Sequence, residues 1–579
     1  MTDPSGRTRP IRIANCSGFY GDRLAAAREM VEAGPIDVLT GDWLAELTML
    51  ILFKDRLKNP DGGYAKTFVR QMEQVMGTCL ERGIKVVANA GGLNPRGCAQ
   101  AVETVAATLG LSPRIAYVTG DDVLPRLAEL GDLTNLDTGE PLGDRTVLTA
   151  NAYLGGWGIT DALDRGADIV ITGRTTDAAI VMAPAAHHHG WARDDWDALA
   201  GALVAGHVIE CGTQATGGNY SFFTEVPDLV HPGFPIAEIA ADGSSVITKH
   251  AAHAGQVSTG TVTAQLLYEI AGPRYLNPDV TARFDSIVLT DEGSDRVRIS
   301  GVKGEAPPAT SKVCLNLAGA TKASYTFLLV GLDIERKADL LLAGLFAALP
   351  GGREYFDSVD IDLIRSDQED PARNETAVAQ LRISMRDADP DKFGRALSGA
   401  ITELALASYP GFFGGPSSSQ AYGVYWPALI PTEELTHSVV VGDEVVEVAP
   451  TMAAWTTADV RLPAVPPAPS GPTRRAALGL VAGARSGDKG GNANLGVWVR
   501  TEEEYAWLSE LLTVDKLKEL MPEAGRVERF ELPNLKALNF VLHGLLGEGV
   551  ASSTRLDPQA KSLGEYLRAK HVEIPEVLL

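Results

Sequence analysis

Cysteines are few in this sequence, and their arrangement excludes two kinds of stabilisation. The 579 residues include five, and they are Cys16, Cys79, Cys98, Cys211 and Cys314. Their number is odd, and no two have the C-x-x-C spacing of a zinc ribbon. We therefore expect reduced thiols, neither a disulfide framework nor a zinc ribbon, and a cytoplasmic location.

Long apolar runs and an excess of positive charge are also lacking. The longest apolar run near the start, Met49–Phe53, is far shorter than a bilayer span, and Met1–Pro10 has no apolar segment of the signal-peptide type. The net charge of −23 would repel phosphates over most of the surface. We expect no membrane and no nucleic-acid partner, although a local basic pocket could bind a small anion.

Cofactor fingerprints are missing as well. Gly18–Gly21 and Gly155–Gly158 both depart from the G-x-G-x-x-G spacing of dinucleotide-binding loops. The consecutive histidines His187–His189 would point in different directions on a helix, so they cannot share one ion. The sequence therefore predicts no redox cofactor and no metal site.

The chain is too long for one hydrophobic core, so several domains are expected. Residues 11–215 alternate strand-like and helical patterns, which predicts an α/β fold with a mostly parallel, doubly wound sheet. Residues 216–455 have α+β patterning. A proline-rich linker is expected at 456–475, followed by an α+β module at 476–579.

Polar side chains follow the expected parallel strands where each strand ends in glycine. Such ends meet at one edge of a sheet, where ligands bind. The candidate substrate-binding residues there are Asn15, Ser17, Asn89, Asn94, Asn151, Arg174 and Thr175, with Asp121 beside them and Asp42 and Asp177 as candidate acid–base residues. Alternatively, glycine and Asx residues here only make tight turns and helix caps.

The stretch Thr172–Asp177 is the most informative of these ends. Arg174 could clamp a carboxylate or phosphate, and Asp177 could transfer a proton. The alternative is that Asp177 caps the following helix and Arg174 is its ion-pair partner.

Two further positions could carry acid–base or nucleophilic chemistry. His250 and His253 are three residues apart and could share a helical face, with Lys249 beside them. Cys211 follows Glu210 and could be a nucleophile if a base folds near it. Structural roles are the alternative for all of them.

Glycine-rich segments suggest two ligand-contacting loops. Arg485, Asp488, Lys489 and Asn492 lie among four glycines, which is typical of an anion-binding nest but does not have Walker A spacing. The alternative is a glycine hairpin with an Arg485–Asp488 ion pair. A second segment, residues 410–419, could close over a ligand.

Four segments together resemble a known family. Asn15–Asp22, Leu39–Glu46, Thr172–Asp177 and Arg485–Gly490 are similar to the acyclic terpene utilisation AtuA family. The resemblance implies a large N-terminal domain to about residue 455 and a C-terminal ferredoxin-fold domain. It also implies catabolism of citronellol- and geraniol-type acids through CoA thioesters, alongside a geranyl-CoA carboxylase and an enoyl-CoA hydratase, and it transfers no catalytic residues.

These observations favour an enzyme acting on an acyl-CoA thioester or a branched carboxylic acid, as a hydratase or other lyase. Asp42, Asp177, His250 or His253 would transfer protons, and Arg174, Asn89 and Asn151 would orient the substrate. Coenzyme A would enter only as part of the substrate, and we expect a homo-oligomer. The alternatives are a non-catalytic assembly partner of a biotin-dependent carboxylase and a metal-dependent hydrolase.

Overall fold

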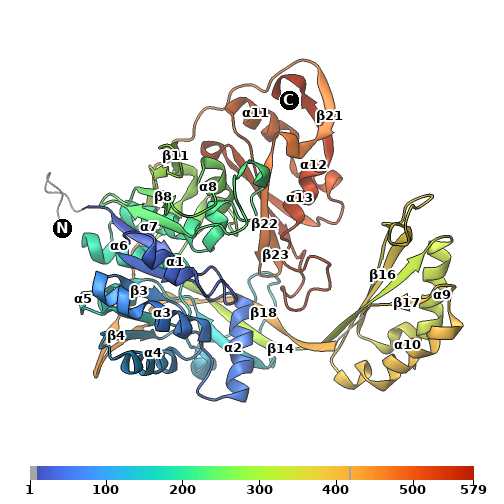
Figure 1. Ribbon diagram of the computed structural model, residues 1–579, viewed down its shortest axis with the longest axis horizontal. Coiled ribbons are helices and arrows are strands. Elements are labelled where there is room, and N and C mark those ends of the chain that lie inside the picture. The colour runs from blue at the N-terminus through green and yellow to red at the C-terminus, as the bar shows by residue number, and fades with distance from the viewer. Residues whose placement is uncertain (1–8, 416–418) are drawn as a thin grey trace. The chain divides into compact units, whose positions relative to one another are not determined.

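The computed structural model describes residues 9–415 and 419–579, which form two compact units (Figure 1). The first unit comprises the chain up to Asn316, Tyr425–Val550 and Gln559–Leu579, and the second comprises Leu317–Val424 and Ala551–Pro558. Residues 1–8, in which no apolar segment of the signal-peptide type was expected, lie outside the described residues. So do residues 416–418 of the loop that was expected to close over a ligand.

A large sheet forms the centre of the first unit, in the order β11-β12-β8-β7-β1-β2-β3-β6-β4-β19-β20. Its middle strands are parallel. They are β1 (Ile11–Asn15), β2 (Val38–Gly41), β3 (Lys85–Ala88), β6 (Ile169–Thr172) and β4 (Ile115–Thr119). The strands on both sides pair antiparallel. They are β7 (Pro235–Ile239), β8 (Ser245–Lys249), β12 (Val297–Ser300), β11 (Val288–Asp291), β19 (His437–Val441) and β20 (Glu444–Val448).

The central sheet is therefore mixed, which corrects the expectation of a mostly parallel doubly wound sheet. The expected strand β5 (Val147–Ala152) exists, but it pairs with the long strand β14 (Thr310–Val330) outside the central sheet. Directly after β5, the backbone N–H of Tyr153 donates to the carbonyl of Lys312 at 2.9 Å. An apolar run indicates a buried strand but not its neighbour or direction, because those depend on distant parts of the chain.

Helices cover both faces of the central sheet. Successive strand residues point to opposite faces, so Val170 packs in one core cluster and Ile171 in the other. The first cluster includes α5 (Trp157–Asp164), α6 (Ala179–His189), α7 (Trp196–Ile209) and α8 (Thr259–Leu266). The second includes α1 (Ala26–Glu32), α3 (Lys66–Arg82) and α4 (Pro95–Leu109). A further helix, α2 (Glu46–Lys58), follows β2 in the chain.

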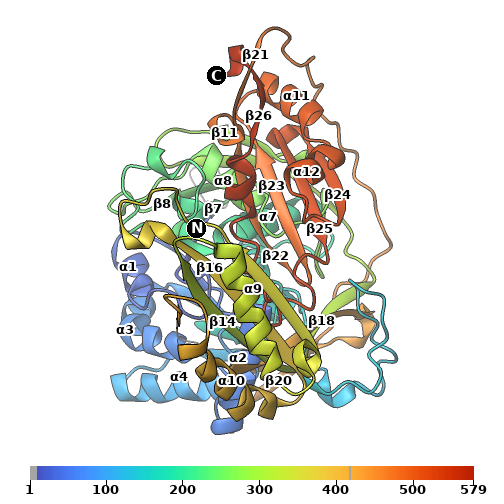
Figure 2. The ribbon, with the colours of Figure 1, turned by 90° about the vertical axis from the view of Figure 1, so that its right-hand side faces the viewer.

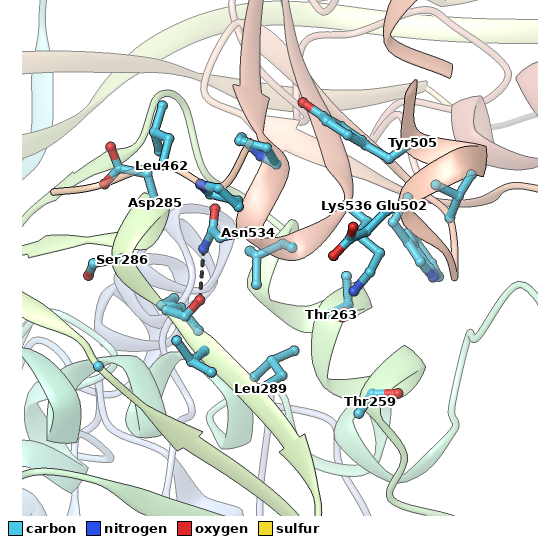
Figure 3. A pocket seen from close by; sticks show the side chains of 18 of the residues that line it. Thr259, Thr263, Asp285, Ser286, Leu289, Leu462, Glu502, Tyr505, Asn534 and Lys536 are labelled. Atoms are coloured by element: carbon cyan, nitrogen blue, oxygen red, sulfur yellow. Dashed lines mark hydrogen bonds between the residues drawn. The ribbon is translucent and has the colours of Figure 1, made fainter. Parts of the chain in front are cut away.

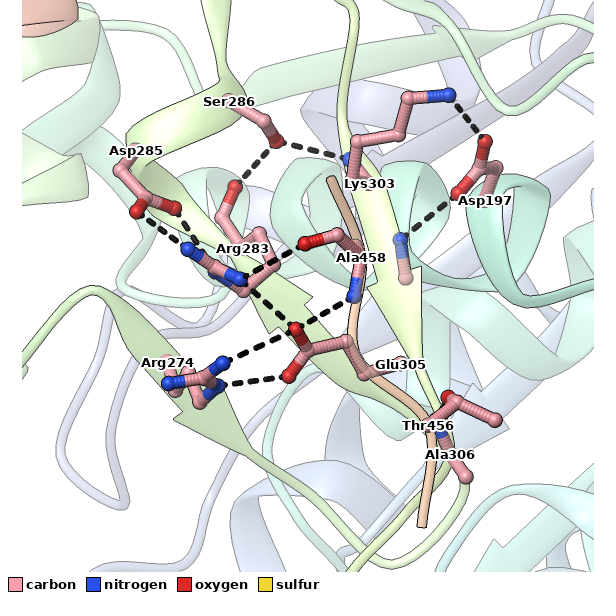
Figure 4. Close-up of polar contacts among 11 residues, drawn as sticks. Asp197, Arg274, Arg283, Asp285, Ser286, Lys303, Glu305, Ala306, Thr456 and Ala458 are labelled. Atoms are coloured by element: carbon pink, nitrogen blue, oxygen red, sulfur yellow. Dashed lines mark hydrogen bonds and ion pairs between the residues drawn. The ribbon is translucent and has the colours of Figure 1, made fainter. Parts of the chain in front are cut away.

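The buried carboxylate of Glu305 anchors the chain segment that follows β20 of the central sheet (Figure 4). The small sheet of β9 (Arg274–Leu276), β10 (Thr281–Arg283) and β13 (Lys303–Glu305) brings Arg274 and Arg283 to Glu305, at 2.7 and 2.8 Å. Burial alone would raise the pKa of Glu305, but the arginines hold it below its usual value. The same carboxylate accepts a hydrogen bond from the backbone N–H of Ala458 at 2.9 Å, so the segment after β20 is fixed at this point.

The C-terminal module belongs to the first unit and has its own core. Its sheet has the order β22-β23-β25-β24, with β22 (Gly483–Lys489), β23 (Asn492–Trp498), β25 (Ala537–His543) and β24 (Arg526–Leu532). Its helices are α11 (Glu502–Leu511), α12 (Val514–Leu520) and α13 (Leu563–Arg568), and β21 (Thr473–Ala477) pairs with β26 (His571–Pro575). A capping box between Thr501 and Glu504 fixes the start of α11.

The second unit places helices on one face of an antiparallel sheet. The sheet contains β15 (Ser358–Ile364), β16 (Val378–Asp387), β17 (Phe413–Gly414), part of β14 and part of β18 (Ser419–Pro431). The helices are α9 (Ile334–Ala347) and α10 (Arg395–Ala407), and Figure 2 shows α9 across the strands β14 and β16. Leu341 and Leu397 of these helices pack on Leu381 and Ile383 of β16.

Two sequence features can be compared with the structure directly. The five cysteines all lie in the described part of the chain and are free thiols. No helix formed by the described residues has both the length and the apolar character needed to cross a bilayer.

Gly201 provides a test of the packing around α7. A Cβ at this position would overlap the carbonyl oxygen of Gly243, so Gly201→Ala should lower the free energy of unfolding by about 1–3 kcal/mol. The matched control is Gly77→Ala in α3, where a Cβ would come no closer than 3.8 Å to Leu111. The control should be neutral or stabilising by up to about 1 kcal/mol. Urea denaturation of both variants gives the comparison, and equal midpoints would contradict the packing described.

Candidate functional site

The ends of β2 and β3 hold a buried carboxyl group. Asp42 follows β2 and Asn89 follows β3, and both are buried. The Asn89 amide donates a hydrogen bond to the Asp42 carboxyl group, while its Oδ1 accepts one from the backbone N–H of Trp43 at 2.8 Å. The backbone N–H of Leu44 also donates to Asp42, at 3.0 Å. Asn89 therefore fixes the position of Asp42.

Arg174, after β6, connects several strand ends. Its residue exposure is 2%. Its Nη1 donates to Asp177 Oδ1 at 2.5 Å and to the carbonyl of Leu44 at 2.9 Å, and its guanidinium lies 4.3 Å from the ring centre of Tyr153. The Asp177 side chain is 27% exposed. The ion pair thus joins a buried cation to a carboxylate that reaches solvent.

Glu210 lies directly after α7 and adds a second buried carboxyl group. The side chain of Asn15, at the end of β1, donates to the Glu210 carbonyl at 3.2 Å. The Glu210 Oε1 is 3.3 Å from Nδ1 of His207, whereas its Oε2 is buried without a hydrogen-bond partner among the described residues.

The protonation states follow from burial and charge. Burial raises the pKa of Asp42 and of Glu210 well above the usual range, and the charge of Asp177 raises both further, while Arg174 opposes the rise. Burial lowers the pKa of His207 to about 4. These shifts favour the protonated carboxyl groups of Asp42 and Glu210 and the neutral imidazole of His207 around the Arg174–Asp177 ion pair. This arrangement, called here the acid cluster, can donate and accept protons.

Asp121 and Asn151 support the acid cluster from a neighbouring strand end. Asp121 Oδ2 accepts hydrogen bonds from the backbone N–H of Arg174 at 2.9 Å and from the Asn151 amide at 2.8 Å. Burial raises the pKa of Asp121 to about 7. Although β5 lies outside the central sheet, a single bridge between Asp122 and Asn151 brings it to this position.

The C-terminal module holds the backbone of residues 269–271 with side-chain amides. Asn494 of β23 accepts a hydrogen bond from the N–H of Glu269 at 2.8 Å and donates one to Asn539 of β25. Asn539 donates to the carbonyls of Ile270 and Ala271, and Lys489 donates to the carbonyl of Glu269 at 3.1 Å. We call the Asn494–Asn539 pair the amide clamp.

The amide clamp fixes an unusual backbone conformation next to the acid cluster. Glu269 has a φ of +57°, which costs a non-glycine residue about 1–2 kcal/mol. Burial is the main reason for the raised pKa of Glu210 and of Cys211, and the charge of Glu269 raises both further. Glu269 is therefore a further carboxyl group near the cluster, held in place by the module.

Two module glycines allow the close approach of this segment. A Cβ on Gly487 would overlap the Tyr268 ring, and a Cβ on Gly496 would lie 2.5 Å from Cβ of Leu267. Glycine at these positions thus brings β22 and β23 against the end of α8.

The glycine-rich segment of the module is a hairpin, as in the alternative considered from the sequence. β22 and β23 pair through to Lys489 and Asn492, leaving only Gly490 and Gly491 in the turn. Asn492 donates to Asp137 at 2.7 Å and accepts from the N–H of Gly544 at 2.8 Å, and Asp488 lies within β22. The pairing depends on the whole sheet, so the local glycine count could not reveal it.

Several candidate residues lie elsewhere or have structural contacts. His250 Nε2 bonds the carbonyl of Met30 in α1 at 2.9 Å, and the His253 ring is 5.4 Å from the His250 ring. No acid-cluster residue is among the groups that shift the pKa of either histidine. Asn94 caps α4, accepting from the N–H of Gly97 at 2.9 Å. Ser17 donates to the carbonyl of Phe19 at 3.0 Å, and the buried Thr175 follows Arg174.

A groove of about 1150 Å³ lies at a different place in the first unit (Figure 3). Its lining includes Thr263 of α8, Leu289 of β11, Leu462, Tyr505 of α11, Asn534 and Lys536. Asn534 donates to the carbonyls of Phe284 and Ile287 at 2.8 and 2.9 Å. None of the acid-cluster residues lines this groove.

Comparison with known proteins connects this geometry to a family. Residues 11–441 match the acyclic terpene utilisation family protein AtuA, and residues 476–573 match the AtuA ferredoxin-like domain. The chain belongs to the AtuA family. The resemblance inferred from the sequence motifs is thereby confirmed, as is the ferredoxin-like nature of the C-terminal domain. No curated protein and no solved structure matches the chain.

In this AtuA-family chain, sequence reasoning missed part of the acid cluster and its support. Glu210 was named from the sequence only as the neighbour of the candidate nucleophile Cys211, and no local sequence pattern indicates a role for Glu269. One signal was available for the amide clamp, because Asn494 and Asn539 each interrupt an otherwise apolar strand pattern. A buried asparagine in such a strand needs partners for its amide. Among the described residues, no group of three or more His, Cys, Asp or Glu side chains is arranged to hold a metal ion.

The raised pKa of Asp121 predicts a pH dependence of stability. Its folded-state pKa of about 7 exceeds its ordinary value of 3.8, so the folded protein keeps a proton that the unfolded chain loses. The stability from this group is fully present below pH 4 and is lost as the pH rises towards 7, by roughly 1.4 kcal/mol per unit of pKa shift. Asp121→Asn should reduce this loss in urea denaturation between pH 4 and 8. The exposed Asp144→Asn is the control, and identical pH slopes for wild type and Asp121→Asn would refute the assignment.

The glycine fit predicts how the ferredoxin-like domain docks. Gly496→Ala should force Leu267 away and lower the unfolding free energy by about 1–3 kcal/mol. It should also speed proteolysis of residues 459–472. Gly525→Ala is the matched control in the same domain, since a Cβ there meets nothing within 4 Å. Limited proteolysis followed by mass spectrometry compares the two, and equal cleavage rates would contradict the fit.

Proposed function

We propose that this protein is an enzyme of acyclic terpenoid acid breakdown that performs a hydration, dehydration or related lyase step. The substrate is an acyl-CoA thioester or a branched carboxylic acid. The family description, acyclic terpene utilisation, supports the metabolic setting. The observation that carries the proposal is the acid cluster, in which the buried Asp42 and Glu210 flank the Arg174–Asp177 ion pair.

The cluster has the groups that a dehydration needs. A base removes the proton next to the carbonyl group, the electron pair forms the new double bond, and an acid gives a proton to the departing hydroxyl, which leaves as water. We assign Asp177 as the base, because its carboxylate reaches solvent beside a buried cation. We assign Asp42 as the acid, because burial raises its pKa and so favours its protonated form. Hydration is the reverse sequence.

Arg174 and Asn151 would orient the substrate. A fixed guanidinium stabilises the negative charge that develops on the carbonyl oxygen during proton removal. The Asn151 Oδ1 is buried without a hydrogen-bond partner in the described part of the chain, so it can accept a bond from a substrate hydroxyl. Asn89 acts through Asp42, whose position it fixes.

The test pairs a substrate screen with two matched variants. Branched 3-hydroxyacyl-CoA and enoyl-CoA thioesters and the free acids are incubated with the protein, and gain or loss of water is followed by mass spectrometry. Asp177→Asn should lower kcat/KM by roughly 100-fold or more, with an unchanged circular dichroism spectrum. Asp161→Asn, which removes the 2.7 Å helix-surface pair with Arg165, should retain full activity. Equal activity of both variants would disprove the role of Asp177.

A further inference from the structure

Among the described residues three arginines are buried, and Arg485 differs from the other two. Arg174 pairs with Asp177, and Arg283 pairs with Asp285 and Glu305. Arg485 is 5% exposed, yet its Nε and Nη2 are buried without a hydrogen-bond partner in the described part of the chain. Its guanidinium stacks 4.3 Å from the ring centre of Tyr268.

This placement is costly unless an anion completes it. A guanidinium remains charged at every relevant pH, and a buried charge without a counter-charge destabilises a protein. The ring of Tyr268 offsets only part of that cost. The guanidinium groups of the other two buried arginines are neutralised by carboxylates of the chain itself. For Arg485 an external oxyanion would serve the same purpose.

A second cation approaches the same ring. Lys561 donates a hydrogen bond to the Tyr268 hydroxyl, and its Nζ lies 4.9 Å from the ring centre. Lys489, expected from the sequence to act with Arg485, donates to the Glu269 carbonyl. Arg485, Gly487 and Lys489 alternate along β22 and so share one face, the one that meets residues 268–269.

We propose that Arg485 and Lys561 form an oxyanion-binding subsite around Tyr268, which receives the carboxylate or phosphate end of a substrate. Nε and Nη2 lie on one edge of the guanidinium and point in parallel, which matches two oxygens of a carboxylate or phosphate. The inference rests on the proposed function in one respect: that function supplies the two ligands considered, which are a free acid and the phosphates of a CoA thioester.

Anion binding can be measured without turnover. The full-length protein in chloride buffer is titrated with inorganic phosphate and, separately, with 3-methylbutanoate by isothermal calorimetry. Wild type should bind at least one of them, and the one bound identifies the source. Arg485→Met should weaken binding at least tenfold, and Arg485→Lys should bind less well than wild type because it keeps the charge but loses the paired donors. Lys561→Met, at an exposed position, should also weaken binding.

A stability measurement separates this role from a structural one. In chloride buffer without phosphate or carboxylate, Arg485→Met should melt at or above the wild-type temperature, because it removes a buried charge that has no ion-pair partner among the described residues. Arg283→Met, the control, should melt lower, because it removes the ion-pair partner of the buried Asp285 and one of the two arginines that pair with Glu305. Its anion affinity should be unchanged. The proposal is overturned if wild type binds neither probe, if Arg485→Met binds as wild type does, or if Arg485→Met melts lower or fails to fold.

Failure of this proposal is distinguishable from failure of the proposed reaction. Loss of anion affinity in Arg485→Met together with unchanged turnover in Asp177→Asn would uphold the subsite and reject the reaction. Unchanged anion affinity in Arg485→Met together with lost turnover in Asp177→Asn would reject the subsite alone.

Discussion

The Arg174 guanidinium is the charge on which the polar centre of the first unit depends. Burial pushes Asp42 and Glu210 towards the neutral form, and Arg174 is the cation that opposes this shift in both. Its backbone is equally central, since the N–H bonds Asp121 and the carbonyl accepts from Leu154. One residue thereby links the ends of β2, β4, β5 and β6. The carboxyl groups of the acid cluster can lie close together in the protein interior because the Arg174 cation is fixed among them.

The ferredoxin-like domain contributes contacts that the N-terminal domain could not make alone. Its amide clamp satisfies the backbone groups of residues 269–271, and its glycines admit Leu267 and Tyr268. A left-handed Glu269 persists only where surrounding contacts determine it. The ferredoxin-like domain therefore fixes the backbone at Glu269, whose charge acts on Glu210 of the acid cluster.

Local patterns allowed part of this arrangement to be predicted. Thr172–Asp177 has its glycine turn, arginine and carboxylate within a few residues. The parallel strands β2, β3 and β6 place Asp42, Asn89 and Arg174 at one edge. The antiparallel flanks of the sheet could not be predicted, because hydrophobic periodicity does not carry strand direction. Glu269 and its partner Asn494 are 225 residues apart, so no window of sequence contains both. His250 and His253 have a plausible spacing, but their surroundings are set by α1.

The anchoring of Ala458 at Glu305 has a consequence for how the ferredoxin-like domain is retained. Chain without helix or strand runs from Ala458 to β21, and residues 459–472 span at most about 50 Å when fully extended. A domain on so short a tether has an effective concentration in the millimolar range near its docking surface. Release of the amide clamp would thus be followed by rapid rebinding of the same copy, and exchange with domains of other chains would be rare.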